Sequence, residues 1–206
     1  VREKIGYGFG DMASSMFWKL FGTYLLFFYT DVLGISAAAL GTMLLVSRIW
    51  DTVFDPVVGV IADRTSSRWG KFRPYLLYMA LPFGAIGVLT FTVPSYSGAG
   101  LLAYAYVTYS LMMMVYSLIN VPYASLLGVI SADAKDRNAL ASYRMAFAFA
   151  GSFIALALFQ PLVSFFGNAG SGHNVGRSWQ LAVAVISVLC VALFLGCFAW
   201  VRERVK

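Results

Sequence analysis

Long apolar stretches alternate with short polar segments along the whole chain. Six of the stretches are long enough to be helices, and we place them at residues 6–32, 37–62, 74–94, 101–127, 141–166 and 179–201. Each holds about 20 residues or more, the length that an α-helix needs to cross the hydrocarbon layer of a membrane. Turns rich in glycine or proline separate them at Gly34, 94–100 and 167–176. The pattern predicts an all-α membrane protein with six transmembrane helices.

The composition agrees with this prediction. The chain is 60% hydrophobic and only 12% charged, whereas a soluble domain carries about 25% charged residues. No Asp, Glu, Lys or Arg occurs at positions 74–132, a run that fits two membrane spans joined by a tight turn. Cys190 and Cys197 lie about 10 Å apart along one helix, which is too far for a disulfide. The cysteines give no metal-binding spacing.

The basic residues are distributed unevenly between the two sides of the expected membrane. Eleven of the fifteen Lys and Arg residues lie at the N-terminus, in residues 63–73, in residues 131–138 or at the C-terminus, all on one side. The other side has Arg177 alone. Short loops rich in Lys and Arg stay cytoplasmic. We therefore expect a multi-pass protein of the plasma (inner) membrane with both termini in the cytoplasm. Because the basic residues flank the helices, nucleic acid is not expected as a partner.

Charged residues also occur in the middle of the second expected helix, where charges are costly and often mark the path of an ion or substrate. Arg48, Asp51 and Asp55 are spaced so that they share one helix face. Two carboxylates one turn apart could bind Na⁺ or share a proton. The alternative is an ion pair between Arg48 and Asp51 that locks two helices together. Pro56 could leave a backbone carbonyl free to face the ion.

The first expected helix has a polar face of its own, formed by Asp11, Ser15 and Lys19. Counted from the same side, Lys19 lies about 18 Å into its helix and Asp51 about 21 Å into the next one. The two residues should therefore have a similar depth, and we expect Lys19 to approach Asp51 or an anionic group of a substrate. The alternative is a lysine that extends its amine to the membrane surface.

Two further positions could contact a polar ligand. Asn120 and Pro122 are expected to interrupt the fourth helix, where the Asn120 amide could bind a hydroxyl group of a ligand such as a sugar or join two helices. Arg144 lies one to two turns into the fifth helix, and its guanidinium could hold hydroxyls or a carboxylate. The alternative is that Arg144 marks the cytoplasmic boundary.

Gly6, Gly8 and Gly10 form a G-x-G-x-G run in the first expected helix. No strand precedes the run, so it does not predict a nucleotide site. Small residues at this spacing instead favour close packing between helices.

Several runs together resemble the glycoside–pentoside–hexuronide:cation symporters, the melibiose-carrier-like branch of the major facilitator superfamily. The runs are KIGYGFGD at 4–11, FYTD at 28–31, RIWDTVFDP at 48–56, DRTSSRWGKFRP at 63–74 and NVPY at 120–123. The resemblance covers the whole chain. It implies cation-coupled sugar transport by alternating access, a six-helix bundle of two inverted three-helix repeats, and no cofactor other than the coupling ion, H⁺ or Na⁺.

The resemblance also implies roles for individual residues. The cation-site positions are Asp51, Asp55 and Ser117, which would be the place for any Na⁺. The sugar-contact positions are Ser15, Asn120, Ala124 and Arg144, to which we add Asp11 and Lys19 because they share the polar face of the first helix.

The chain departs from melibiose-type members at several of these positions. Those members have acids at Ser15 and Asn120, an aromatic residue at Ala124 and Asn at Phe54. The loss of both acids argues against melibiose itself as the substrate. Phe54 cannot donate an oxygen, which favours H⁺ over Na⁺, and Lys19 favours an acidic sugar such as a hexuronide.

The loop at 63–73 has a mechanical interpretation from the same resemblance. In the superfamily such a loop holds the two halves together in one state and releases them in another. The charged residues that we assign to this gating network are Arg48, Asp63, Arg64, Arg68, Lys71 and Arg73. The alternative is that the basic residues only fix the topology.

Transporters of this type have twelve helices in two bundles, with the substrate between them. Residues 1–206 provide one bundle, so we expect the N-terminal half, with a sugar or glycoside, the lipid bilayer, and either a C-terminal six-helix half or a second copy of itself as partners. The alternatives are a lipid or drug carrier of the same fold, a half-size scaffold, or a homodimeric half-transporter. An enzyme is not expected, because the single His173 falls in a loop and no Cys/His cluster forms.

Overall fold

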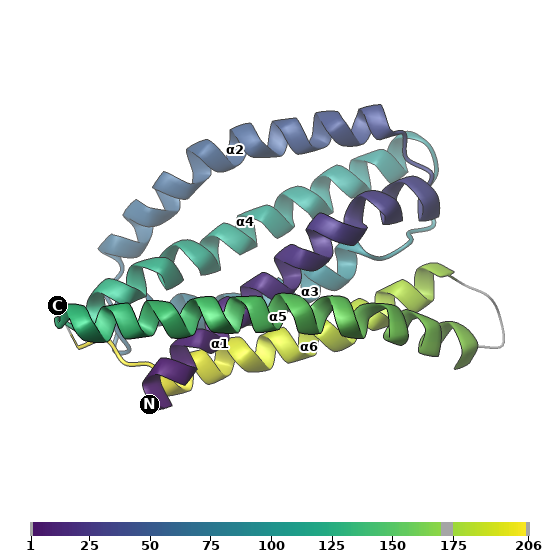
Figure 1. Ribbon diagram of the computed structural model, residues 1–206. Helices are drawn as coiled ribbons and strands as arrows, with labels where there is room; N and C mark the ends of the chain where they lie inside the picture. The colour runs from purple at the N-terminus through teal and green to yellow at the C-terminus, as the bar shows by residue number, and fades with distance from the viewer. Residues whose placement is uncertain (1, 170–174, 205–206) are drawn as a thin grey trace.

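The structure is a computed structural model that describes residues 2–169 and 175–204. In this part of the chain the regular elements are helical, as predicted, and Figure 1 shows their arrangement. The elements are α1 (Arg2–Leu20), η1 (Phe21–Leu25), η2 (Phe28–Val32), α2 (Ala37–Arg64), α3 (Arg73–Thr90), α4 (Ala99–Ile130), α5 (Ala134–Ala169) and α6 (Val175–Trp200). The two π-helical segments η1 and η2 continue α1 towards the α1–α2 turn.

The start of α1 and the segment after α6 lie at the same end of the bundle, together with the α2–α3 and α4–α5 connections (Figure 1). The α1–α2 and α3–α4 connections lie at the opposite end. This arrangement gathers the strongly basic segments of the sequence at one end of the molecule.

The helices pair in a symmetric pattern. α1 packs against α5 and α6, α3 packs against α4 and α6, and α2 packs mainly against α4. Exchanging α1 with α4, α2 with α5 and α3 with α6 converts the α1–α5 pair into α2–α4 and the α1–α6 pair into α3–α4. α1 and α4 run in opposite directions (Figure 1). The α5–α6 pair is the exception, because α2 and α3 have no comparable contact in the described residues.

Glycines allow α1 to lie close to its neighbours. A Cβ added to Gly6 would lie 2.6 Å from Cβ of Trp200 on α6, and one added to Gly8 would lie 2.7 Å from the Phe147 ring on α5. Forcing extra carbon atoms into such contacts costs about 1–3 kcal/mol. The prediction that this glycine run serves helix packing is confirmed.

Most predicted helix limits lie within four residues of the observed ones, but the start of α5 was predicted wrongly. α5 begins at Ala134 rather than at 141, so most of the expected loop at 131–138 is helical. The reason is local: Oδ1 of Asp133 accepts a hydrogen bond from the backbone N–H of Lys135 at 3.2 Å, which satisfies a donor of the first turn. The expected turn at 167–176 is also too long, since α5 reaches Ala169 and α6 begins at Val175, and its centre lies outside the described residues.

Prolines do not break the helices. Pro122 is buried inside α4, which continues from Ala99 to Ile130, so the predicted interruption at Asn120 and Pro122 is wrong. α2 likewise runs through Pro56. Proline removes one backbone hydrogen bond, and a surrounding bundle of helices tolerates that loss.

Three helices, α4, α5 and α6, are long and apolar enough to cross a membrane, judged by length and composition. α1 and α2 are not among them, and they contain Asp11, Lys19, Arg48, Asp51 and Asp55, which place charged side chains within their apolar stretches. The charges that interrupt the apolar pattern therefore lie mainly on α1 and α2, and a polar site is expected near them.

Candidate functional site

An ion pair joins α1 to α5. Nε of Arg144 lies 3.2 Å from one carboxylate oxygen of Asp11, and Nη2 lies 3.5 Å from the other. The guanidinium also lies over the ring of Tyr123, with Cζ 5.4 Å from the ring centroid, which is a cation–π contact. Because α5 begins at Ala134, Arg144 lies about three turns into the helix and not at its boundary. The carboxylate that this arginine holds belongs to the chain itself.

Asp51 and Asp55 lie one turn apart on α2, as the spacing predicts. Both are partly buried, and in each the Oδ1 atom is buried without a hydrogen-bond partner in the described part of the chain. Asp51 also lies within electrostatic reach of Asp55 and Arg48. A buried carboxylate oxygen without a partner is costly, and a proton or a bound cation would remove that cost.

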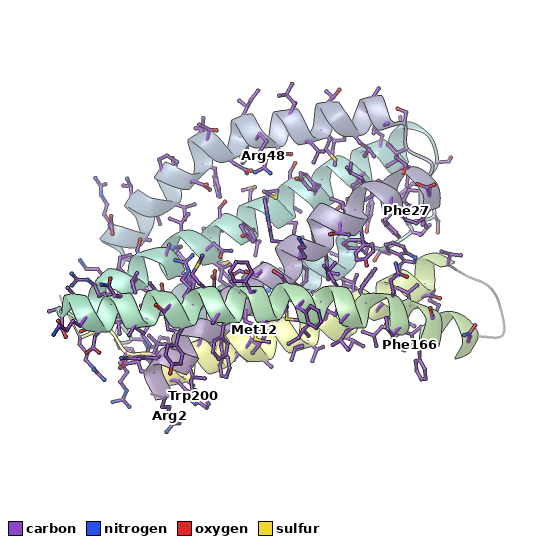
Figure 2. The ribbon with its side chains drawn as sticks, in the orientation of Figure 1. Arg2, Met12, Phe27, Arg48, Phe166 and Trp200 are labelled. Atoms are coloured by element: carbon purple, nitrogen blue, oxygen red, sulfur yellow. The ribbon has the colours of Figure 1, made fainter. Side chains whose placement is uncertain are left out.

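Arg48 does not form the alternative ion pair with Asp51 within the residues that the structure describes. Its side chain points inward from α2 (Figure 2), and its Cζ lies 5.3 Å from the ring centroid of Trp18. Trp18 in turn lies 5.3 Å from the ring of Tyr116. The two contacts connect α2, α1 and α4 through one tryptophan.

Tyr116, on α4, lies near both charged groups. Its hydroxyl lies within electrostatic reach of Asp11, Arg144, Asp55 and Arg48. The ion pair on α1 and α5 and the charged face of α2 are therefore both within electrostatic reach of one side chain on α4. Predicted residues from three separate helices, α1, α2 and α5, thus belong to one polar region around Tyr116 of α4, a residue that was not predicted.

The remaining predicted residues lie on the same helices with different surroundings. Lys19 is exposed and forms no ion pair among the described residues, so the expected approach to Asp51 is not found. The Asn120 amide donates to the carbonyl of Tyr116 in its own helix at 3.1 Å. Ser117 is buried, Ser15 is partly buried and Ala124 is exposed.

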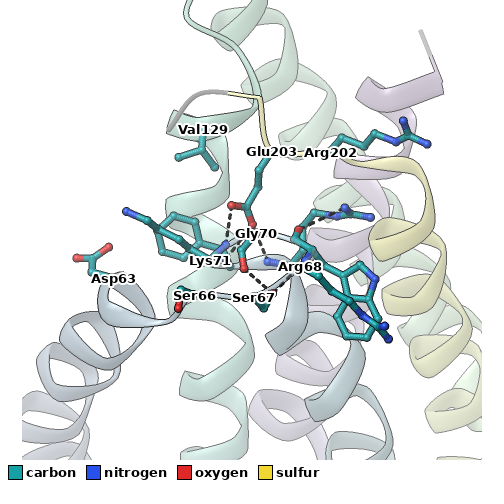
Figure 3. A pocket seen from close by; sticks show the side chains of 12 residues that line it. Asp63, Ser66, Ser67, Arg68, Gly70, Lys71, Val129, Arg202 and Glu203 are labelled. Carbon is teal, nitrogen blue, oxygen red and sulfur yellow. Dashed lines mark hydrogen bonds between the residues drawn. The ribbon is translucent and has the colours of Figure 1, made fainter.

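A second polar cluster lies at the end of the bundle that carries the chain termini. The carboxylate of Glu203, in the segment after α6, accepts hydrogen bonds from three successive backbone N–H groups at the start of α3. The donor–acceptor distances are 2.8 Å for Lys71, 2.8 Å for Phe72 and 2.9 Å for Arg73. The first N–H groups of a helix lack partners inside the helix, so Glu203 caps α3 from a distant part of the sequence (Figure 3).

Gly70 makes this cap possible. Its φ of +112° lies in the left-handed region that favours glycine. A Cβ at this position would also collide with the Glu203 carboxylate. The conformation and the contact both require a residue without a side chain.

The capped loop lines a cavity of about 640 Å³ (Figure 3). The lining residues are Asp63, Ser66, Ser67, Arg68, Trp69, Gly70, Lys71, Phe72, Arg73, Val129, Arg202 and Glu203. Most of the predicted gating residues are therefore together at this end of the bundle. Arg48 is not among them, because it lies in the polar region near Trp18.

The predicted gating residues interact mainly with aromatic and backbone groups. The Arg68 guanidinium lies 4.1 Å from the Trp69 ring centroid, and Nη2 of Arg73 donates to the Phe198 carbonyl at 2.6 Å. Asp63 and Arg64 are exposed and form no ion pair in the described part of the chain.

Sequence reasoning missed two acids that organise this end. Glu203 is described above, and the Glu3 carboxylate forms an ion pair with Arg204 at 2.9 Å and accepts from the Arg202 N–H at 3.2 Å. The signal was present, because Glu203 is an acid inside an otherwise basic terminal segment. Lys206, counted among the cytoplasmic basic residues, lies outside the described residues.

Comparison with known proteins gives one consistent family. Residues 6–206 match the family model described as MFS/sugar transport protein. The chain is 44% identical over 206 residues to the inner membrane symporter YicJ of Escherichia coli K12 and 45% identical over 204 residues to the putative glycoside/cation symporter YagG of the same organism. It is 38% identical over 204 residues to the isoprimeverose transporter of Lactiplantibacillus pentosus.

These matches cover 100%, 99% and 99% of the chain but only 44%, 44% and 42% of the respective relatives. The chain therefore spans less than half the length of the curated relatives it matches. The matched region includes the charged residues of α1, α2 and α5 and the capped loop. The resemblance to the glycoside and cation symporters is confirmed, and the chain belongs to the MFS/sugar transport protein family.

Proposed function

We propose that this chain forms the N-terminal six-helix half of a cation-coupled sugar or glycoside symporter that works by alternating access, and is not an enzyme. All six helices cross the membrane in this proposal. Its membership of a sugar transport family supports it, as does the pairing of helices, which has the symmetry expected of two inverted three-helix repeats.

The observation that carries the proposal is the pair of carboxylates on α2. Asp51 and Asp55 each keep a buried oxygen without a partner in the described residues, next to the region that contains Arg144 and Asn120. A coupling ion needs a site that it can enter and leave, and unpartnered carboxylate oxygens provide one. We place the ion at Asp51 and Asp55, with Ser117 facing them from α4, and the sugar near Arg144, Asn120, Ala124 and Ser15.

The side chains around the acids favour a proton as the coupling ion. Na⁺ needs several oxygen ligands from its site, as hard cations generally do. Phe54, which lies between the two acids in sequence, supplies none and stacks on Trp50 with ring centroids 6.1 Å apart. A proton needs only one of the two carboxylates.

The capped loop at 63–73 is the proposed gate. Asp63 and Arg64 are exposed at this end of the bundle and could pair with a second six-helix bundle in one state of the cycle. That second bundle is either a C-terminal half or another copy of this chain. The relatives are more than twice as long as the chain, which supports a C-terminal half.

The test is uptake of radiolabelled sugars by membrane vesicles that contain the intact transporter. Neutral glycosides and uronides are each offered with an imposed pH gradient or an imposed Na⁺ gradient. We expect accumulation of at least one sugar that is driven by the pH gradient and abolished by a proton carrier. Sugar uptake that reaches equilibrium but never exceeds it, under either gradient, would disprove cation coupling.

The orientation can be tested with single cysteines. Ser66 lies in the α2–α3 loop and Ser97 lies before α4 at the opposite end of the bundle, and both are exposed. A membrane-impermeant maleimide should label Ser66→Cys in inside-out vesicles and Ser97→Cys in right-side-out vesicles. The native Cys190 and Cys197 are buried, so background labelling should be low. The reverse pattern would place the termini outside the cell.

A further inference from the structure

We propose that Asp11 is a specificity-determining residue that makes the sugar site select neutral sugars over acidic ones. It does so by neutralising Arg144 and by fixing which edge of the guanidinium faces the substrate. This inference rests on the proposed sugar site and deepens it by naming the substrate class, a neutral sugar with adjacent hydroxyl groups.

The first step is the geometry of the ion pair. A guanidinium has five N–H donors arranged in a planar fork. Asp11 occupies the edge formed by Nε and Nη2, at 3.2 Å and 3.5 Å. Among the described residues Nη1 forms no hydrogen bond, so the edge formed by Nη1 and Nη2 keeps donors for a ligand, with the Tyr7 hydroxyl within electrostatic reach of the same guanidinium. Two donors side by side on that edge match two adjacent hydroxyl oxygens of a sugar ring.

The second step is access. Arg144 is 31% exposed whereas Asp11 is only 13% exposed. The arginine can therefore reach a ligand, while the carboxylate stays behind it. The ring of Tyr123 lies against one face of the guanidinium, which further limits how Arg144 can turn. Asp11 is a positioning residue in this arrangement, and not a direct sugar ligand as the sequence suggested.

The third step is the charge balance. The polar region holds three acids, Asp11, Asp51 and Asp55, and two bases, Arg48 and Arg144, while Lys19 lies exposed on α1 without an ion pair among the described residues. A neutral sugar leaves this balance unchanged. An acidic sugar would have to compete with Asp11 for Arg144, because the carboxylate position on the guanidinium is already taken. The acid would then have to bind Lys19 or Arg48, which are both exposed, so the charge of Lys19 does not by itself make the site prefer an acidic sugar.

The test compares the affinity of the intact transporter for a neutral glycoside with that for the uronide of the same ring and aglycone. Binding is followed by equilibrium dialysis, and the measured quantity is the ratio of the two affinities. The wild-type protein should prefer the neutral sugar. In Asp11→Asn the freed positive charge on Arg144 should shift the ratio about tenfold towards the uronide, because hydrogen bonds to charged partners are stronger than those to neutral ones.

A matched control exists on the same two helices. Lys4 and Asp136 also join α1 to α5, at 3.0 Å, but they lie at the helix ends. Asp136→Asn should leave the ratio unchanged. Asp11→Glu keeps the charge and lengthens the side chain, so it should weaken both affinities and preserve the ratio, and it provides a second readout if Asp11→Asn is poorly folded.

An unchanged ratio in Asp11→Asn, or a changed ratio in Asp11→Glu, would overturn the inference while leaving the proposed symport intact. A wild-type protein that prefers the uronide would also overturn it. Failure of the wild-type protein to bind any sugar would instead disprove the proposed function itself, and the inference with it.

Discussion

Two regions of the bundle contain partly buried acids, Glu203 in one and the pair Asp51 and Asp55 in the other. The carboxylates of the two regions differ in how many hydrogen bonds they accept. Glu203 accepts three backbone hydrogen bonds at the start of α3. Each of the two α2 acids keeps a buried oxygen without a partner in the described residues. A satisfied carboxylate holds the structure together, whereas an unsatisfied one has capacity left for a ligand.

The same contrast applies to the bases. Arg73 donates to the Phe198 carbonyl and lies over the Phe198 ring, so it is held in place. Arg48 has an aromatic partner in Trp18 but remains exposed. We therefore expect substitutions of the capping residues Gly70 and Glu203 to change mainly stability, and substitutions in the polar region to change mainly transport.

The largest effect is expected at the unsatisfied acids. Replacing both acids together, Asp51→Asn with Asp55→Asn, should lower gradient-driven accumulation of sugar by about 100-fold, equivalent to about 2.7 kcal/mol, since neither amide can bind a proton. Unfolding should be affected little, because the neutral side chains remove costly buried charges. The measurement is the accumulation ratio in vesicles. Asp31→Asn, at an exposed acid near the other end, is the control, and accumulation at the wild-type level in the double variant would contradict the role assigned to the two acids.

The next largest effect is expected at Gly70, and it should concern stability. Gly70→Ala forces a residue with a Cβ into a φ of +112° and against the Glu203 carboxylate. The strain should cost about 2 kcal/mol and lower Tm by roughly 4–8 °C, measured by thermal unfolding in detergent. Gly22→Ala is the matched control, since nothing lies within 4 Å of a Cβ there. Equal Tm values for the two variants would contradict the assigned role of the cap.

A smaller effect is expected at Glu203 itself. Glu203→Gln keeps the size of the side chain but removes the charge that favours a helix N-terminus, which costs about 1 kcal/mol. Hydrogen exchange of the Lys71, Phe72 and Arg73 amides should become about fivefold faster, in line with that energy. Glu3→Gln also loosens the terminal segment, through Arg204, but should leave these three amides unchanged. Identical exchange in both variants would mean that the cap is not specific.

The smallest effect is expected at Trp18. Trp18→Leu removes the ring beneath Arg48, a contact worth about 0.5–1 kcal/mol, so sugar affinity should fall about two- to fivefold. Trp18→Phe should retain most of the affinity. Trp50→Leu is the control, because Trp50 is exposed and contacts Phe54 on its own helix. Equilibrium dialysis with the preferred sugar measures the three affinities. A larger loss of affinity in Trp50→Leu than in Trp18→Leu would indicate that the sugar lies nearer to Trp50 than to Arg48 and Trp18.

Much of the fold follows from the sequence, because the apolar period and the turn residues are local. The shared face of Arg48, Asp51 and Asp55 is of this kind, since it depends only on helical spacing. The early start of α5 also has a local cause, the hydrogen bond that Asp133 accepts at the first turn. It was missed because the polar residues at 131–138 also fit a loop. Pro122 was misjudged because its cost depends on the neighbouring helices.

Partners between helices could not be predicted in the same way. Helix spacing gives the depth of Lys19 and Asp51, but it does not say that Arg48 lies over Trp18 instead of pairing with an acid. The pair of Asp11 and Arg144 joins residues 133 positions apart, and the cap by Glu203 joins residues about 130 apart. Such contacts depend on how the helices rotate about their axes when they pack, which the periodicity of one helix does not contain.

The cap on α3 also has a consequence for biosynthesis. Glu203 follows α6, so the α2–α3 loop cannot take its final form until the last of these helices has left the ribosome. Until then the three N–H groups at the start of α3 lack their carboxylate partner. This cap therefore forms only after all six helices have been synthesised, and it is among the last contacts of the bundle to be completed.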